Sequence, residues 1–157
     1  MKMLATGVAL FSLSLSIAGC AGNDGNIETG NTVNPTINNT AGNKMKVTIG
    51  SVGFTAILND NATTAAFSGM LPLTISMEDL HGNEKFYYFP GTLPSDASPG
   101  GNIQPGDLML YGNNCLVLFY EGVSTSYSYT RIGHIENVSG LAAALGTGNV
   151  TVKFEIE

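Results

Sequence analysis

Arg131 is the residue of this sequence whose chemistry is easiest to place beside other functional groups. It is the only arginine, and it alternates with Tyr127 and Tyr129, so a β-strand would carry all three side chains on one face. A guanidinium beside tyrosine rings can bind a carboxylate or an amide carbonyl. The alternative is an ion pair with Asp107 or Glu121 that ties neighbouring strands together.

Aromatic residues between positions 86 and 129 are more numerous than the interior of a small barrel needs. Alternation along the strands requires some of these rings to face outward, where they and the Pro/Gly-rich segment 91–105 would line a shallow cleft. We expect this cleft to bind a peptide or a small molecule. The candidate ligand-binding residues are Phe86, Tyr88, Tyr111, Phe119, Tyr127, Tyr129 and Arg131.

Other reactive residue types are sparse. His134 and Glu136 have the spacing of a metal pair on a strand, but the chain has two histidines and no further cluster of ligands, which predicts no metal site. Cys115 lies in the apolar run 115–120 and is predicted to be a buried, unreactive thiol. His81, in a Gly-Asn turn, is predicted to be solvated. No hydrolase, metalloprotease or phosphate-binding motif is present, so the sequence predicts neither catalytic residues nor a cofactor.

The N-terminus has the pattern of a bacterial lipoprotein. Lys2 precedes an apolar run over residues 3–15 that is too short to span a bilayer as a finished helix. Ile-Ala-Gly directly before Cys20 is typical of the signal at which that cysteine receives its lipid. The alternatives are a plain secretory signal with an incidental cysteine, or an uncleaved anchor. We therefore predict a signal peptide over residues 1–19 and lipidation at Cys20.

Charge and composition limit the partners and the location. Removal of residues 1–19 takes away one basic and no acidic residue, which changes the formal charge from −6 to −7 and disfavours nucleic acid and anionic lipid headgroups. The predicted membrane contact is therefore the lipid on Cys20. Ala21 after that cysteine favours the outer membrane of the bacterial envelope. Residues 20–43 lack aromatic residues and are predicted to form a flexible tether to one domain over residues 44–157.

The domain reads as mainly β. Alternating or continuous apolar runs bounded by Gly, Pro and Asn predict about eight strands, and two Ala-rich segments predict short helices. The predicted strands are 46–49, 54–58, 73–77, 85–89, 107–111, 115–120, 126–134 and 150–156, and the predicted helices are 62–70 and 138–145. The run Asn59-Asp60-Asn61 offers an N-cap to the first helix, and Asn137 or Ser139 offers one to the second. Residues 91–105 are predicted to be a loop. This pattern favours a closed barrel with two short capping helices.

Three stretches of the domain carry a family resemblance. Residues 105–112, 115–120 and 126–134 resemble the bacterial cyclophilin-like domain family, a small relative of the cyclophilin fold. The resemblance extends over residues 46–156 and includes segments 71–77, 82–85 and 140–145. It implies a cyclophilin-like barrel of about eight strands with two helices, in agreement with the independent strand pattern.

The resemblance also bears on activity. Cyclophilins isomerise Xaa-Pro bonds with an arginine that donates to the proline amide, within a Phe-His-Arg stretch. The best counterpart here is Phe86-Tyr87-Tyr88-Phe89, which lacks both His and Arg. We therefore expect a binding domain without catalysis. The alternatives are a peptidyl-prolyl cis-trans isomerase with weak activity and an accessory domain of a redox or flavin system.

Overall fold

The computed structural model describes residues 43–157, so the predictions made for residues 1–42 lie outside the described part of the chain. Within that part the fold is mainly β, as predicted, and no helix has the length and hydropathy needed to span a bilayer. The elements are β1 (Lys44–Ile49), β2 (Val52–Leu58), α1 (Ala62–Ser68), β3 (Leu73–Leu80), β4 (Glu84–Tyr88), β5 (Ser98–Ile103), β6 (Asp107–Tyr111), β7 (Cys115–Phe119), β8 (Val123–Ile135), α2 (Leu141–Leu145) and β9 (Val150–Ile156).

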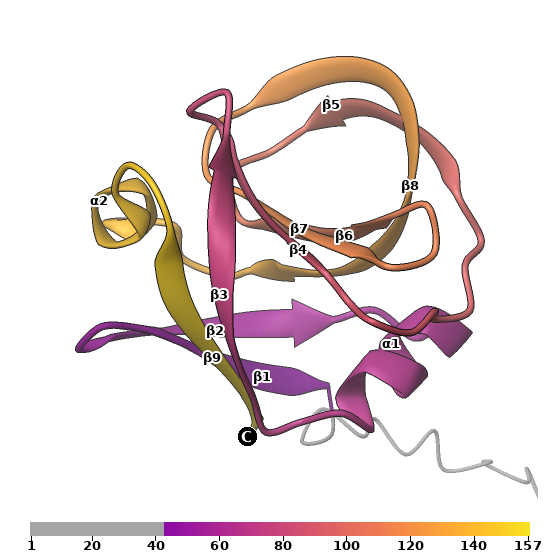
Figure 1. Cartoon of the computed structure of the whole chain (residues 1–157), viewed down its shortest axis with the longest axis horizontal. Coiled ribbons are helices and arrows are strands. Elements are labelled where there is room, and N and C mark those ends of the chain that lie inside the picture. The colour runs from indigo at the N-terminus through magenta and orange to yellow at the C-terminus, as the bar shows by residue number, and fades with distance from the viewer. Residues whose placement is uncertain (1–42) are drawn as a thin grey trace, which may run out of the picture. The chain divides into compact units, whose positions relative to one another are not determined.

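Eight of the strands form a closed antiparallel ring. Their order is β2-β1-β9-β3-β4-β7-β6-β8, and β8 pairs back onto β2 where Ala56 lies opposite Ile135. The predicted closed barrel of about eight strands is therefore confirmed. The ninth strand, β5, lies outside the ring and pairs only with the first half of β8. Figure 1 shows the long β8 ribbon bending through a wide arc, with β5 following it.

The interior of the ring is a continuous apolar core. Alternate residues of each strand point inward, as in β9, where Val152 and Phe154 are fully buried and their neighbours are exposed or half-buried. Helix α1 inserts Phe67 among the strands, and its ring packs edge-on against Phe154 at 5.8 Å between centroids. Helix α2 adds Leu141 and Leu145 to the same core. Both helices are held by the burial of these side chains because each is too short to be stable alone.

Asn61 joins helix α1 to β8. Its side-chain oxygen accepts a hydrogen bond from the backbone N–H of Thr64 at 2.9 Å, which confirms the predicted N-cap. Its amide nitrogen donates to the backbone carbonyl of Arg131 at 2.8 Å, and the Thr64 hydroxyl donates to the carbonyl of Ile132 at 3.1 Å. The helix start is therefore fixed to the half of β8 that closes the barrel.

Two predictions about irregular segments were wrong. Residues 91–105 contain strand β5, because Pro99 and the glycines occupy an edge strand, where a missing N–H and a bulge are tolerated. Gly100 packs closely against β8, since a Cβ atom there would lie 3.0 Å from Cγ2 of Thr125 and 3.2 Å from the backbone oxygen of Tyr127. Helix α2 begins only at Leu141 with Gly140 as its N-cap, and neither of the predicted caps serves it.

Candidate ligand-binding cavity

The sheet has a second apolar surface on its outer side. Side chains of β4, β6, β7 and β8 that point away from the barrel core form a separate cluster, which the arc of β8 and the added strand β5 partly cover. Its buried members are Ile103, Met109, Cys115, Val117, Phe119 and Tyr129. One cross-strand row on this surface consists of Tyr88, Cys115, Tyr111 and Tyr129, each lying opposite the next on neighbouring strands. The pairing register therefore places three tyrosines and a cysteine side by side.

A cavity of about 490 Å³ lies over this surface. That volume is within the range of small-molecule sites. The residues around it come from the end of β3, the turn between β3 and β4, β4, β6, β7 and the first half of β8. They are Leu80, His81, Asn83, Glu84, Phe86, Tyr88, Tyr111, Cys115, Val117, Val123, Ser124, Thr125, Tyr127 and Tyr129.

Aromatic contacts fix the two walls of the cavity. On the β6–β8 side, the ring of Tyr111 lies 6.0 Å from Tyr127 and 5.4 Å from Tyr129 between centroids. On the β4 side, Phe86 and Tyr88 make an edge-to-face pair at 5.8 Å. These arrangements match the preferred geometries of aromatic pairs, so the rings support one another without a ligand. Part of the aromatic surface stays open, since Tyr127 is 65% exposed and Tyr88 is 58% exposed.

Among the lining residues, Glu84 supplies the one carboxyl and His81 the one imidazole. Glu84 is half-buried at the start of β4, and His81 is exposed in the preceding turn. Burial raises the pKa of the Glu84 carboxyl above its ordinary value, and the nearby His81 offsets part of that effect. Burial, followed by the charge of Glu84, raises the pKa of Tyr129 to about 12. No lysine or arginine is among the cavity-lining residues of the described chain.

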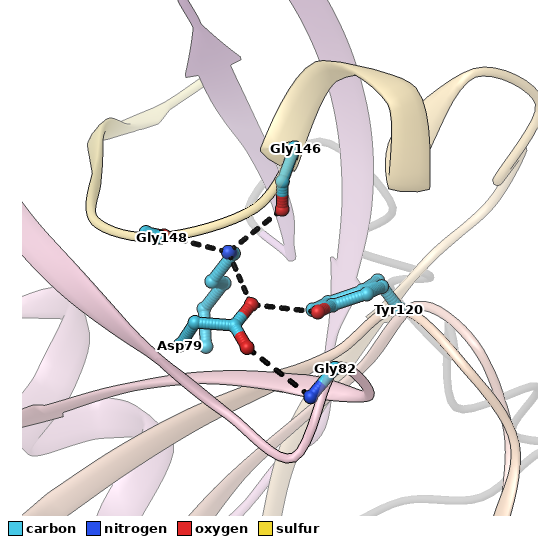
Figure 2. A network of polar contacts seen from close by, with 6 residues as sticks. Asp79, Gly82, Tyr120, Gly146 and Gly148 are labelled. Carbon is cyan, nitrogen blue, oxygen red and sulfur yellow. Dashed lines mark hydrogen bonds and ion pairs between the residues drawn. The ribbon is translucent and has the colours of Figure 1, made fainter.

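A buried ionic network anchors the turn that precedes Glu84. The Lys85 ammonium is fully buried and donates to the Asp79 carboxylate and to the backbone carbonyls of Gly146 and Gly148, both at 2.8 Å. Figure 2 shows the same carboxylate accepting from the Tyr120 hydroxyl at 2.7 Å and from the Gly82 N–H at 3.1 Å. The network thus ties β3, β4 and Tyr120, the residue after β7, to the segment after α2.

The pKa values of this network follow from its hydrogen bonds. The Lys85 ammonium and then the Tyr120 hydroxyl hold the pKa of Asp79 below its ordinary value. Burial and the hydrogen bond to Asp79 raise the pKa of Tyr120 to about 12. Asp79 therefore stays ionised and Tyr120 stays protonated near neutral pH, which keeps every bond of the network in place.

Five of the seven candidate residues line the cavity together: Phe86, Tyr88, Tyr111, Tyr127 and Tyr129. Phe119 is fully buried and packs edge-on against Tyr129 at 5.8 Å, so it supports the wall from behind. Arg131 does not line the cavity. Its guanidinium donates to the Asp107 carboxylate at 3.1 Å, which is one of the two ion pairs proposed as the alternative.

The sequence interpretation missed the polar residues of the cavity. Glu84 alternates with Phe86 and Tyr88 along β4, so the same period of two that selected the rings also places this carboxyl among them. His81 and Asn83 precede β4 in a turn, and no local pattern marked them. The same alternation marks Thr125, two residues before Tyr127 on β8, so this period would have found two polar cavity residues in advance.

The cysteine and the His134–Glu136 pair form neither a nucleophilic site nor a metal site. Cys115 is buried, as predicted, and burial raises the pKa of its thiol, which disfavours the reactive thiolate. His134 is exposed on β8, and Glu136 pairs instead with Lys44 at 3.6 Å. Within residues 43–157, no group of three or more His, Cys, Asp or Glu side chains is placed to hold a metal ion.

Comparison with known proteins supports the cyclophilin-like resemblance. The model of the cyclophilin-like family matches residues 47–155, which include all but the outermost residues of the barrel. A hypothetical protein of Archaeoglobus fulgidus, solved in solution, superposes with a TM-score of 0.53 at 16% identity, covering 74% of this chain and 96% of that one. At that identity the likeness shows the fold alone. Comparison with curated proteins finds no match for this chain.

Proposed function

Because this chain belongs to the cyclophilin-like family, we propose that it is a lipid-anchored binding module that takes up a small molecule or a peptide segment in its outer cavity without catalysing a reaction. The cavity carries the proposal. Its volume and its mostly aromatic and aliphatic lining are those of a ligand site, and its rings are held by one another rather than by a guest. Anchoring through Cys20 would hold this cavity at the bacterial envelope, in the outer membrane.

The side chains of the cavity support binding rather than isomerisation. An isomerase of the cyclophilin type needs a strong donor aimed at the proline amide, and no lysine or arginine is among the lining residues. Arg131 is engaged with Asp107. The Cys115 thiol is buried with a raised pKa and is a poor nucleophile.

The binding proposal can be tested with the full chain. We would titrate a panel of aromatic fragments and short Pro-containing peptides into isotope-labelled protein and follow the amide resonances. Shifts confined to the β4, β6, β7 and β8 residues around the cavity support the proposal. Tyr127→Ala should weaken binding, because it removes a largely exposed wall, whereas Ile156→Ala should not, because this exposed β9 side chain is not in the lining.

The absence of catalysis has its own test. A protease-coupled assay on a Pro-containing peptide should give the uncatalysed rate of cis-trans isomerisation. Acceleration well above background that Tyr127→Ala abolishes would establish the cavity as an isomerase site and overturn the non-catalytic part of the proposal.

A further inference from the structure

The cavity contains a carboxyl group that forms no ion pair in the described chain, and the basic side chain near it is that of the exposed His81. The ion pairs of the described residues join Lys44 to Glu136, Lys85 to Asp79, Arg131 to Asp107 and Lys153 to Glu155. Glu84 takes part in none of them. Lys85, its neighbour in sequence, points to the opposite face of β4, where its ammonium is occupied by the network around Asp79. Glu84 is therefore a half-buried acid beside an apolar cavity.

The aromatic walls of the cavity carry the complementary feature. The faces of tyrosine and phenylalanine rings attract cations through their quadrupole, and this attraction grows when water is excluded. Tyr88 and Phe86 stand on one side and Tyr111, Tyr127 and Tyr129 on the other, so a guest in the cavity meets several rings at once. A carboxylate beside such rings prefers a positive charge for the same electrostatic reason.

We propose that the cavity binds an organic cation: an ammonium group held between the Glu84 carboxylate and the tyrosine rings, with an apolar body over Cys115 and Val117. The inference rests on the proposed function, since it names the ligand class of the same cavity. The opposite charge is disfavoured, because an anion would meet Glu84 at short range with no lysine or arginine in the lining to balance it. A neutral ligand would make no charge interaction that offsets the free-energy cost of burying the Glu84 carboxylate.

Three probes of similar size separate the possibilities: 2-phenylethylammonium, 2-phenylethanol and phenylacetate. Calorimetric titration of the full chain near neutral pH should show the cation binding about tenfold tighter than the alcohol, with phenylacetate weakest. Glu84→Gln should weaken the cation about tenfold and leave the alcohol unchanged, because only the charge interaction is removed. Glu155→Gln is the matched control, since it removes the same charge from β9, outside the cavity, and should change neither affinity.

The outcomes distinguish the inference from the function on which it rests. If the alcohol binds as tightly as the cation, or if Glu84→Gln leaves the cation's affinity unchanged, the proposed cation site is contradicted. The proposal of an apolar binding cavity is then still supported. If none of the three probes binds, the inference fails and the proposed binding function loses its main support. Tyr127→Leu adds a check on the rings: it should weaken the cation more than the alcohol, and an equal loss for both would contradict the aromatic contribution.

Discussion

At the scale of single residues, Lys85 and Glu84 differ in whether a charge removed from water has a partner. They are adjacent on β4 and point to opposite faces of the sheet. The Lys85 ammonium is fully buried and has three acceptors, including an ionised one. Glu84 is half-buried without an ion-pair partner in the described chain. The first arrangement stabilises the fold, and the second is typical of a functional site, where local stability is given up for binding.

Replacement of Lys85 should destabilise the barrel. Lys85→Met leaves the Asp79 carboxylate and the carbonyls of Gly146 and Gly148 without their donor, which should lower the free energy of unfolding by about 2–4 kcal/mol. Urea denaturation followed by circular dichroism measures this loss. Lys153→Met is the control, because Lys153 is half-exposed in a surface pair with Glu155 and should cost less than about 1 kcal/mol. Equal losses for the two variants would contradict a structural role for the network.

Replacement of Glu84 should have the opposite effect on stability. Because the folded-state pKa of Glu84 is raised above the ordinary value of 4.5, its ionisation favours the unfolded chain as pH rises through that range. Glu84→Gln should therefore be more stable than the wild type at pH 7, and the difference should disappear well below pH 4.5, where the carboxyl is protonated in both states. Thermal unfolding at the two pH values measures it. A variant less stable at pH 7 would mean that the carboxylate makes a stabilising contact.

At the scale of elements, barrel closure depends on the close approach of β8 to β2. A Cβ atom at Gly133 would overlap the backbone of Ile57 on β2, where the two strands pair. Gly133→Ala should therefore lower the free energy of unfolding by about 2–3 kcal/mol. Gly53→Ala is the control, because a Cβ atom there meets only the flexible end of Lys46. If the free energy of unfolding of Gly133→Ala equals that of Gly53→Ala, the claim that barrel closure depends on this contact is contradicted.

The accuracy of the sequence predictions also differs by element. Strands with strict alternation, such as Val150–Ile156, were predicted with their observed bounds, because a period of two is a local signal. β5 was not, because its Pro and Gly residues oppose a strand locally and only pairing with β8 sustains it. The same holds at the cavity. Rings on β4 and β8 were found by alternation, and the Arg131–Asp107 pair is one of the two alternatives that the sequence offered for Arg131. The place of His81 at the cavity was missed, because it depends on contacts between segments.

At the scale of the whole molecule, the ring of eight strands leaves β5 as a short, irregular edge. A closed barrel limits edge-to-edge association, which suits a domain proposed to stand outside the cytoplasm. The core inside the ring and the cavity outside it use opposite faces of β4, β6, β7 and β8. Changes at exposed cavity residues should therefore alter binding with little effect on the barrel.

The proposed anchor gives a prediction that is independent of the barrel. In a bacterial host that processes lipoproteins, the full chain should incorporate radiolabelled palmitate and fractionate with membranes. Cys20→Ser should abolish both, since it removes the proposed acylation site. Cys115→Ser is the control, because it replaces the only other cysteine and should retain the label. Persistence of the label in Cys20→Ser would contradict lipidation at this position.

The most direct test of the central claim, that the outer cavity is a ligand site, is a crystal structure of the full chain with 2-phenylethylammonium. The account predicts the ammonium between the Glu84 carboxylate and the tyrosine rings, with the phenyl ring over Cys115 and Val117. An empty cavity at ligand concentrations that saturate the protein in solution, or a ligand bound elsewhere, such as beside Asp107, would contradict it.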